Sequence, residues 1–397
     1  MENNRFEARR AAAKRRKIRA FKAVMSFFGT AIAVFICLQI LSVLIPSLAL
    51  SSGNKPESVR VSNSGLAIMD QFEMSMTNEI SEALDGIIKI ERTYWLSDSQ
   101  LVAPKGKTDH FGTATSPAEL AWLLEETKDL VGDQELIFNM DTPVWEHDKI
   151  YYYYDDTILA IVWKQKIEGC IFTLAEIKVA DGSQFRRFLA GGEFGADKQF
   201  VTTEMSGSVN AIVATSGDFY KFRKNGIVVY DGQVQRFEGK WIDTCFINDQ
   251  GDLILSPRKQ FTKKEEAQAF VDENNIRFSL VFGPILVDNY QATKTGQYPL
   301  GEPLDKYTRA AICQVDEKHY MFANVTTEPD YGFLYRMTIN DFAKVLANLG
   351  VQKAYALDGG QTTVICMEDR LISYPDYGTQ RQISDIIYFA TAMPNGG

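Results

Sequence analysis

The sequence predicts an α+β domain, rich in mixed or antiparallel strands with a few flanking helices, behind one N-terminal transmembrane helix. Strand-like runs separated by turn signals follow one another from residue 149 to the C-terminus. Only a few capped helical segments interrupt them, and no internal repeat is present. Many strands with few helices are typical of an α+β domain. The composition, 45% hydrophobic and 12% aromatic, is that of a globular body.

A basic tail and an uncharged stretch open the chain. Residues 1–22 hold nine basic and two acidic residues, and residues 23–50 hold no charged residue. About 20 apolar residues span a bilayer, and a basic flank marks the cytoplasmic side. We therefore expect a single-pass protein of the cell membrane that contacts the lipid bilayer through 23–50, with a cytoplasmic N-terminus and an extracellular C-terminal domain. The alternative is a cleaved signal peptide, whose apolar region normally has about 7–15 residues.

The remaining boundaries follow from composition and apolar periodicity. Residues 64–92 carry apolar side chains at steps of three or four, which predicts a helix. Its stripe either packs on its own domain or forms a homodimer stalk. The predicted order is a tail at 1–22, an anchor at 23–50, a tether at 51–63, a helical juxtamembrane region at 64–148 and the main domain at 149–397.

Charge and cysteine usage exclude some functions. Beyond residue 22 there remain 33 basic and 49 acidic residues, a balance of −16, so no nucleic-acid partner is expected. No Cys-x-x-Cys or Cys/His cluster indicates a metal site, and no cofactor is expected. Calcium or magnesium at Asp218 or Asp358 is compatible with the sequence but not indicated by ligand spacing. The cysteines outside the span are either plain core residues or partners in one or two disulfides: Cys170, Cys245, Cys313 and Cys366.

Local signals predict several elements of the main domain. Capped helices are expected at 115–132 (Ser116 and Glu119), 262–275 (Thr262 and Glu265) and 338–350 (Thr338, ending at Gly350). The last of these, with strands at 319–326 and 354–357, predicts a β-α-β-like unit. Hairpin turns are expected at Asp155-Asp156 and Asp231-Gly232.

Four stretches place polar residues and glycine at strand ends: 215–223, 281–287, 307–312 and 356–364. Their core residues are Gly-Asp-Phe-Tyr (217–220), Phe-Gly-Pro (282–284), Thr-Arg-Ala-Ala (308–311) and Leu-Asp-Gly-Gly (357–360), followed by "QRQISDIIYFATA". Each is weak alone, because such residues are common in ordinary turns.

In this order, the motifs resemble the phosphodiester glycosidase family from about residue 170 onward. That family includes the lysosomal uncovering enzyme, which removes N-acetylglucosamine from a phosphodiester on mannose, and many exported bacterial proteins. This chain departs from the family pattern at several points. Ser216 stands where many members have Asn, and Cys313 stands where they have Gly. Asn324-Val325-Thr326 replaces the usual Asp-Gly-Arg, and Gln361-Thr362-Thr363 replaces a glycine-serine tail.

The resemblance implies a site, and the chemistry explains its residue types. Arginine offers paired donors to phosphate oxygens, and glycine lets backbone N–H groups approach closely. A carboxylate stabilises the oxocarbenium character that develops at the sugar carbon. The catalytic candidates are Asp358, Asp218 and Arg309, the last as phosphate clamp. The substrate-binding candidates are Gly217, Arg223, Gly283, Gly359, Gly360, Gln361, Thr362, Thr363 and Arg381.

Structural roles remain open for several of these residues. Arg309 can instead neutralise Asp358 or Asp218, and Arg223 can be a solvated hairpin residue. Asp385 is expected to cap or bridge strands.

The predicted function is a membrane-anchored extracellular hydrolase that cleaves sugar-1-phosphodiester linkages, of the N-acetylglucosamine-1-phosphate type, in cell-wall or exopolysaccharide glycans. Its partner would be a phosphorylated glycan or cell-wall polymer. The alternatives are a non-catalytic glycan-binding or envelope-assembly module on the same fold, and a structural partner of an envelope complex.

Overall fold

The computed structural model describes residue 96 and residues 102–218, 220–295, 305–332 and 336–393. The predicted tail, anchor, tether and 64–92 helix all lie outside these residues. No helix within the described ranges combines the length and apolar character needed to cross a membrane.

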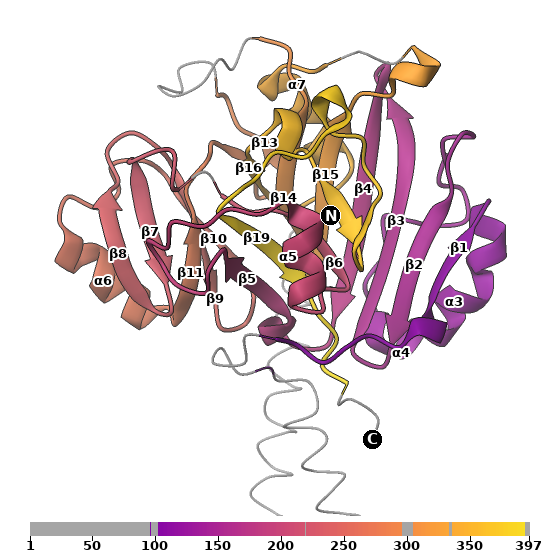
Figure 1. Ribbon diagram of the computed structural model, residues 1–397, viewed down its shortest axis with the longest axis horizontal. Coiled ribbons are helices and arrows are strands. Elements are labelled where there is room, and N and C mark those ends of the chain that lie inside the picture. The colour runs from indigo at the N-terminus through magenta and orange to yellow at the C-terminus, as the bar shows by residue number, and fades with distance from the viewer. Residues whose placement is uncertain (1–95, 97–101, 219, 296–304, 333–335, 394–397) are drawn as a thin grey trace, which may run out of the picture. The chain divides into compact units, whose positions relative to one another are not determined.

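A large antiparallel sheet organises the described part of the chain (Figure 1). Its nine strands run in the order β1-β2-β3-β4-β15-β14-β16-β12-β13. The predicted hairpin at Asp155-Asp156 is confirmed, because β2 and β3 pair across it. The strands are β1 (Phe111–Ala114), β2 (Ile150–Asp155), β3 (Ile158–Ile167), β4 (Cys170–Val179), β12 (Ile285–Asp288), β13 (Gln291–Ala292), β14 (Arg309–Asp316), β15 (His319–Thr326) and β16 (Lys353–Leu357).

Two five-stranded sheets lie against the large one. The β7 sheet has the order β10-β9-β11-β7-β8, and the β19 sheet has the order β18-β17-β6-β19-β5. Asp231 and Gly232 both have positive φ and close the predicted hairpin between β7 and β8. The strands are β5 (Phe185–Leu189), β6 (Val213–Ser216), β7 (Gly226–Tyr230), β8 (Gln233–Glu238), β9 (Thr244–Asn248), β10 (Leu253–Ser256), β11 (Ile276–Leu280), β17 (Ile365–Met367), β18 (Arg370–Leu371) and β19 (Asp385–Phe389).

The helices bear out two predictions only in part. The helix predicted at 115–132 is broken into η2 (Pro117–Leu120), α3 (Ala121–Glu126) and α4 (Lys128–Val131), and Ser116 does not cap it. The carboxylate of Glu119 instead accepts from the Thr115 N–H and hydroxyl. For α6 (Lys264–Glu273), Thr262 bonds Glu266 and not the expected Glu265. The remaining longer helices are α5 (Thr202–Ser208) and α7 (Ile339–Asn348).

The α7 prediction is confirmed in detail. The Thr338 hydroxyl accepts from the Asp341 N–H at 3.2 Å, so it caps the helix as expected. β14 pairs antiparallel with both β15 and β16, so these two are parallel and joined through α7, as the β-α-β-like prediction requires. This crossover brings the end of β16 beside the start of β14, where Ala310 faces Leu357.

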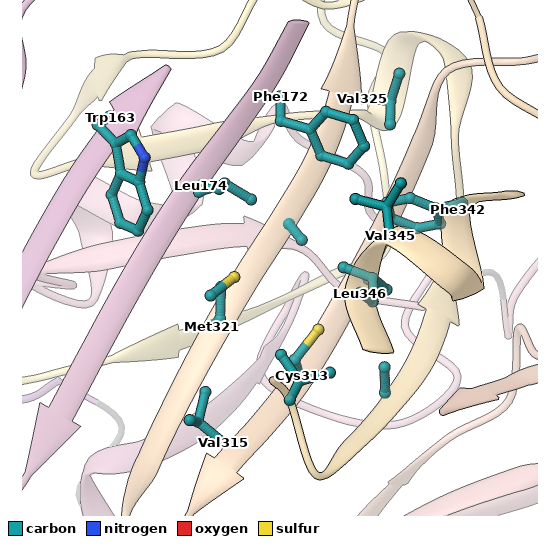
Figure 2. Packing of buried hydrophobic residues seen from close by; sticks show 14 of the residues in the cluster. Trp163, Phe172, Leu174, Cys313, Val315, Met321, Val325, Phe342, Val345 and Leu346 are labelled. Atoms are coloured by element: carbon teal, nitrogen blue, oxygen red, sulfur yellow. The ribbon is translucent and has the colours of Figure 1, made fainter. Parts of the chain in front are cut away.

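Apolar side chains cover both faces of the large sheet. On its outer face, Trp163, Phe172 and Met321 pack with Phe342 and Leu346 of α7 (Figure 2). On its inner face, residues such as Tyr320 and Phe322 pack against the other two sheets. The large sheet is therefore buried on both faces, and polar side chains that serve a site collect where strands end. The β-rich mixed fold class is confirmed.

The four cysteines of the described chain are free and buried. Burial raises the pKa of the thiols of Cys245, Cys313 and Cys366. Of the two readings left open by the sequence, the structure shows plain core cysteines.

Candidate active site

Asp358 follows β16 and forms an ion pair with Arg381, whose Nη2 contacts the Asp358 Oδ2. The Asp358 side chain is 16% exposed and that of Arg381 is 39% exposed, so the pair reaches solvent. Burial raises the pKa of Asp358, while Arg381, the Thr362 hydroxyl and Arg223 each oppose that rise. Two guanidinium groups from distant segments thus act on one carboxylate.

Arg223 is held by its own surroundings in the loop before β7. Its Nη1 donates to the Phe282 carbonyl at 3.0 Å, and its guanidinium lies 4.6 Å from the centre of the Phe282 ring. Next to Phe282, Gly283 has a φ of +69°. The Phe-Gly-Pro motif therefore positions a cation that acts on Asp358.

Glycine is favoured at the two positions after Asp358 for different reasons. A Cβ on Gly359 would lie 2.4 Å from the Thr308 carbonyl oxygen, so only glycine fits. Gly360 has open space but a φ of +71°, which favours glycine. The Gly359 N–H interacts with the Asp358 carboxylate, and the Gly360 N–H donates to the Thr308 hydroxyl at 2.8 Å. Both N–H groups therefore interact with protein atoms, namely the Asp358 carboxylate and the Thr308 hydroxyl.

The residues after the glycines divide into an exposed and a buried part. The Gln361 amide donates to the Thr379 hydroxyl at 2.9 Å on the surface. The Thr362 hydroxyl donates to the Gly359 carbonyl at 2.7 Å. Thr363 is fully buried, and its hydroxyl has no hydrogen-bond partner in the described part of the chain.

A hydrogen-bonded relay links this loop to a second carboxylate. The Thr308 hydroxyl donates to the Asp376 Oδ2 at 3.2 Å, and Arg336 Nη2 lies 3.4 Å from the same oxygen. Because the same hydroxyl accepts from Gly360, it connects the glycine loop to Asp376.

Asp218 lies in a buried network of charged residues, separate from Asp358. Its side chain is 0% exposed, its Oδ2 accepts from the Val281 N–H at 2.7 Å, and Arg187 Nη2 lies 3.7 Å away. Arg187 also pairs with Asp385 at 2.8 Å, and the Asp218 N–H donates to Asp385 at 3.0 Å. Burial, together with Asp218, raises the pKa of Asp385 to about 6. Asp385 thus bridges strands, as expected.

Gly217 is part of that network. A Cβ on Gly217 would lie 2.4 Å from the Asp385 Oδ2, so the glycine makes room for the buried carboxylate.

The Arg309 guanidinium is held by backbone carbonyls. Its Nε donates to the Met337 carbonyl at 3.0 Å and its Nη2 to the Asp305 carbonyl at 2.7 Å. Burial lowers the pKa of this guanidinium to about 10. The expected alternative of an ion pair with Asp358 or Asp218 is absent from these contacts. The structure therefore pairs Asp358 with Arg381, lets the charge of Arg223 act on the same carboxylate, and places Asp218 and the Arg309 guanidinium in other surroundings.

The model of the phosphodiester glycosidase family matches residues 209–390, which contain all of these groups except Arg187. Residues 209–390 belong to the phosphodiester glycosidase family. The resemblance expected from the motifs is confirmed, and the match indicates a phosphodiester glycosidase domain over these residues.

Three solved structures are similar to this chain. A hypothetical protein from Synechocystis has a TM-score of 0.49 at 13% identity, over 63% of this chain and 64% of that protein. The catalytic domain of zebrafish N-acetylglucosamine-1-phosphodiester alpha-N-acetylglucosaminidase, auto-inhibited by its pro-peptide, has a TM-score of 0.47 at 16% identity, over 59% and 82%. A putative exported protein from Burkholderia pseudomallei has a TM-score of 0.38 at 12% identity, over 56% and 74%. No curated protein sequence matches the chain.

A second ion cluster lies at the strand end where the glycosidase family usually has Asp-Gly-Arg. Asn324, Val325 and Thr326 are buried within β15 and cannot serve there. Lys164 Nζ instead lies 2.7 Å from both Asp148 and Glu328, all largely buried. Lys164, Asp148 and Glu328 thus form a largely buried ion cluster at this end of the large sheet, outside the motifs of the sequence.

One cavity of the described chain is remote from the glycosidase motifs. It has a volume of about 990 Å³ and is lined by His110, Asp156, Lys178 and Lys318, at the opposite end of β4 and β15. Its lining contains none of the predicted site residues. No cluster of three or more potential metal ligands occurs in the described ranges.

Sequence reasoning misses Arg187, Asp376 and Arg336. Arg187 sits in an ordinary strand, "FRRFL", and its acidic partner Asp385 is 198 residues away. Asp376 lies in Pro-Asp-Tyr-Gly, which has the composition of a plain turn. Only Arg381, five residues after Asp376, was marked by its motif.

Proposed function

We propose that this chain is a membrane-anchored extracellular hydrolase that cleaves sugar-1-phosphodiester linkages, of the N-acetylglucosamine-1-phosphate type, in cell-wall or exopolysaccharide glycans. The observation that carries the proposal is the ion pair of Asp358 with Arg381 at a solvent-reaching strand end, where the charge of Arg223 also acts on the carboxylate. The uncharged stretch at 23–50 supports the anchor.

The chemistry assigns each group a role. Arg381 and Arg223 bind the non-bridging phosphate oxygens, since guanidinium offers directed donors to them. The phosphate then competes with Asp358 for Arg381, which leaves the carboxylate free to face the sugar carbon. As the bond from that carbon to the bridging oxygen breaks, the electron pair leaves with the phosphate monoester. Asp358 stabilises the positive charge that develops, and water supplies the new hydroxyl.

Asp218 acts in this scheme as a positioning residue. Its carboxylate is enclosed by Arg187 and the Val281 N–H, and it shapes the segment that leads to Arg223. The phosphate contacts are assigned to Arg223 and Arg381 because the charges of both act on the Asp358 carboxylate, whereas no such effect of Arg309 is seen and its guanidinium donates to two carbonyls.

The test uses the purified full chain and the nitrophenyl ester of N-acetylglucosamine-1-phosphate. Glycosidic cleavage releases nitrophenyl phosphate, which turns yellow only after added phosphatase. In ¹⁸O-labelled water the label must enter the sugar hydroxyl and not the phosphate. Label in the phosphate would contradict the proposal, because the P–O bond would then have broken.

A glycan-binding module remains the second candidate, and the enclosure of Asp218 favours it, since one predicted catalytic carboxylate is out of reach. Titration of N-acetylglucosamine-1-phosphate into the full chain separates the two. Binding without turnover, unchanged in Asp358→Asn, would support the module. Turnover that Asp358→Asn abolishes, with cooperative melting retained, supports the enzyme.

A further inference from the structure

The turn at 375–378 combines two features that the mechanism above does not use. It contains the short helix η6 (Asp376–Gly378) and precedes Arg381 by a few residues. Asp376 is 6% exposed, whereas the neighbouring Tyr377 is 83% exposed. One short turn therefore points a carboxylate inward and an aromatic ring outward.

Asp376 is tied to the Asp358 loop through a single hydroxyl. The Thr308 hydroxyl donates to its Oδ2 and accepts from the Gly360 N–H. Arg336 approaches the same oxygen at 3.4 Å. These contacts fix the orientation of the carboxylate and engage only one of its two oxygens.

The other oxygen, Asp376 Oδ1, is buried and has no hydrogen-bond partner among the described residues. The Thr363 hydroxyl, on the chain segment that follows the glycines, is in the same condition. A buried polar atom without a partner loses the hydrogen bonds that it would make to water, so such atoms are rare and call for a reason. A ligand hydroxyl can satisfy either atom, because it can donate to a carboxylate oxygen or accept from a threonine hydroxyl.

Tyr377 supplies independent support. Its φ of +62° lies in the left-handed region, which is unfavourable for a bulky residue. A large exposed ring thus stands at a position whose backbone glycine or asparagine would suit better. An exposed aromatic ring offers an apolar face on which the C–H face of a pyranose ring can pack.

We propose that the 375–378 turn is the sugar-recognition element of the site, in which Asp376 Oδ1 accepts a hydrogen bond from a hydroxyl of the pyranose and Tyr377 stacks on its ring. The inference rests on the proposed function and deepens it, since it assigns sugar selectivity to residues separate from the phosphate-binding arginines.

The experiment measures the affinity of the full chain for N-acetylglucosamine-1-phosphate by calorimetry, together with kcat and KM for the nitrophenyl ester. Tyr377→Ala should weaken binding about tenfold, and Asp376→Asn by a similar factor. In both variants KM should rise more than kcat falls. Tyr377→Phe, which keeps the ring, should bind as the unchanged protein does.

Tyr290 provides a matched control. It is also exposed, at 50%, and also has a left-handed φ of +66°, but it lies between β12 and β13 and contacts Gln352 at the opposite end of β16. Tyr290→Ala should leave the affinity unchanged. Asp288→Asn, at an exposed position on the same turn, is the control for Asp376→Asn.

Tyr377→Gly separates recognition from folding. It should raise the melting temperature, because the backbone strain is relieved, and still weaken binding about tenfold. Variants at 376 and 377 that bind normally, while Asp358→Asn abolishes turnover, would overturn the inference and leave the proposed function standing. An unchanged protein that neither binds nor cleaves the sugar phosphate would overturn both.

Discussion

Asp218 and Asp358 resemble each other in sequence and differ completely in structure. Each is an acid beside glycine at the end of a strand. Asp218 is sealed with Arg187 and Asp385, and the side chains of all three are at most 1% exposed. Asp358 and Arg381 form a pair that reaches solvent. An acid-glycine motif thus marks a place where backbone turns closely, and the surroundings decide whether the acid serves folding or chemistry.

The arginines explain the difference. Arg187 comes from β5, inside the β19 sheet, so its charge lies between layers and needs two carboxylates to be tolerated there. Arg381 comes from the segment before β19 and Arg223 from the loop before β7, so their charges stay at the edge. A cation at the edge can exchange its protein partner for a ligand anion, whereas a cation in the core cannot.

The largest effect should come from removing the buried cation. Arg187→Leu leaves Asp218 and Asp385 without their counter-ion and should lower the free energy of unfolding by about 3–5 kcal/mol. Urea denaturation measures this change. Lys221→Ala, which breaks the exposed pair with Asp197, is the control and should have no measurable effect. Equal stabilities of the two variants would show that the buried network does not support the fold.

In contrast to Arg187→Leu, Asp358→Asn should lower the activity and leave the stability nearly unchanged. We expect kcat to fall by about 10²–10³-fold, because the charge that stabilises the transition state is lost. The melting temperature should stay nearly unchanged, since burial already disfavours the charged carboxylate. Asp218→Asn should instead lower the melting temperature more than it lowers kcat. A variant at 358 that retains full turnover would contradict the distinction.

The pH dependence of stability should reveal the buried network. The raised pKa of Asp385, about 6, exceeds the value of about 4 in an unfolded chain, so the folded state binds the proton more tightly. This group therefore stabilises the fold below about pH 4 and loses that contribution as pH rises to about 6, on the order of 2 kcal/mol. The difference in unfolding free energy between the unchanged protein and Asp385→Asn should change over this window. A constant difference from pH 4 to 7 would contradict the expectation.

The smallest effects concern the glycine loop. Gly360→Ala should cost about 1 kcal/mol, because its Cβ meets open space and only the left-handed backbone is strained. Gly359→Ala should lower kcat more than Gly360→Ala does, because its Cβ would meet the Thr308 carbonyl and displace the loop that holds Asp358. Thermal melting and kcat measured on both variants give the comparison. The reverse order would mean that the loop is not anchored on Thr308.

Local signals explain what the sequence predicts well. The cap of α7, the β15-α7-β16 crossover and the two hairpin turns depend on residues only a few positions apart. Asp358 and Arg381 were found through family motifs, which carry information that a single chain's periodicity lacks.

Long-range pairing explains what it misses. Thr308 and Asp376 meet across 68 residues, and Arg187 and Asp385 across 198. No local preference marks an arginine in a strand as the partner of a distant acid, because burial and sheet order create that need. The proposed role of the Asp376 turn depends on a carboxylate oxygen that is left unpaired only by the folding of the chain, which no local pattern marks.

The burial of the four cysteines of the described chain has a practical consequence. Cys170 and Cys313 lie in different strands of the large sheet, Cys245 lies in the β7 sheet and Cys366 in the β19 sheet, and all four are free and buried. A maleimide reagent would therefore modify the cysteines of a sheet only when that sheet unfolds and exposes their thiols. The chain carries an intrinsic set of reporters, one or more per sheet, from which the order of layer separation during unfolding can be followed by mass spectrometry.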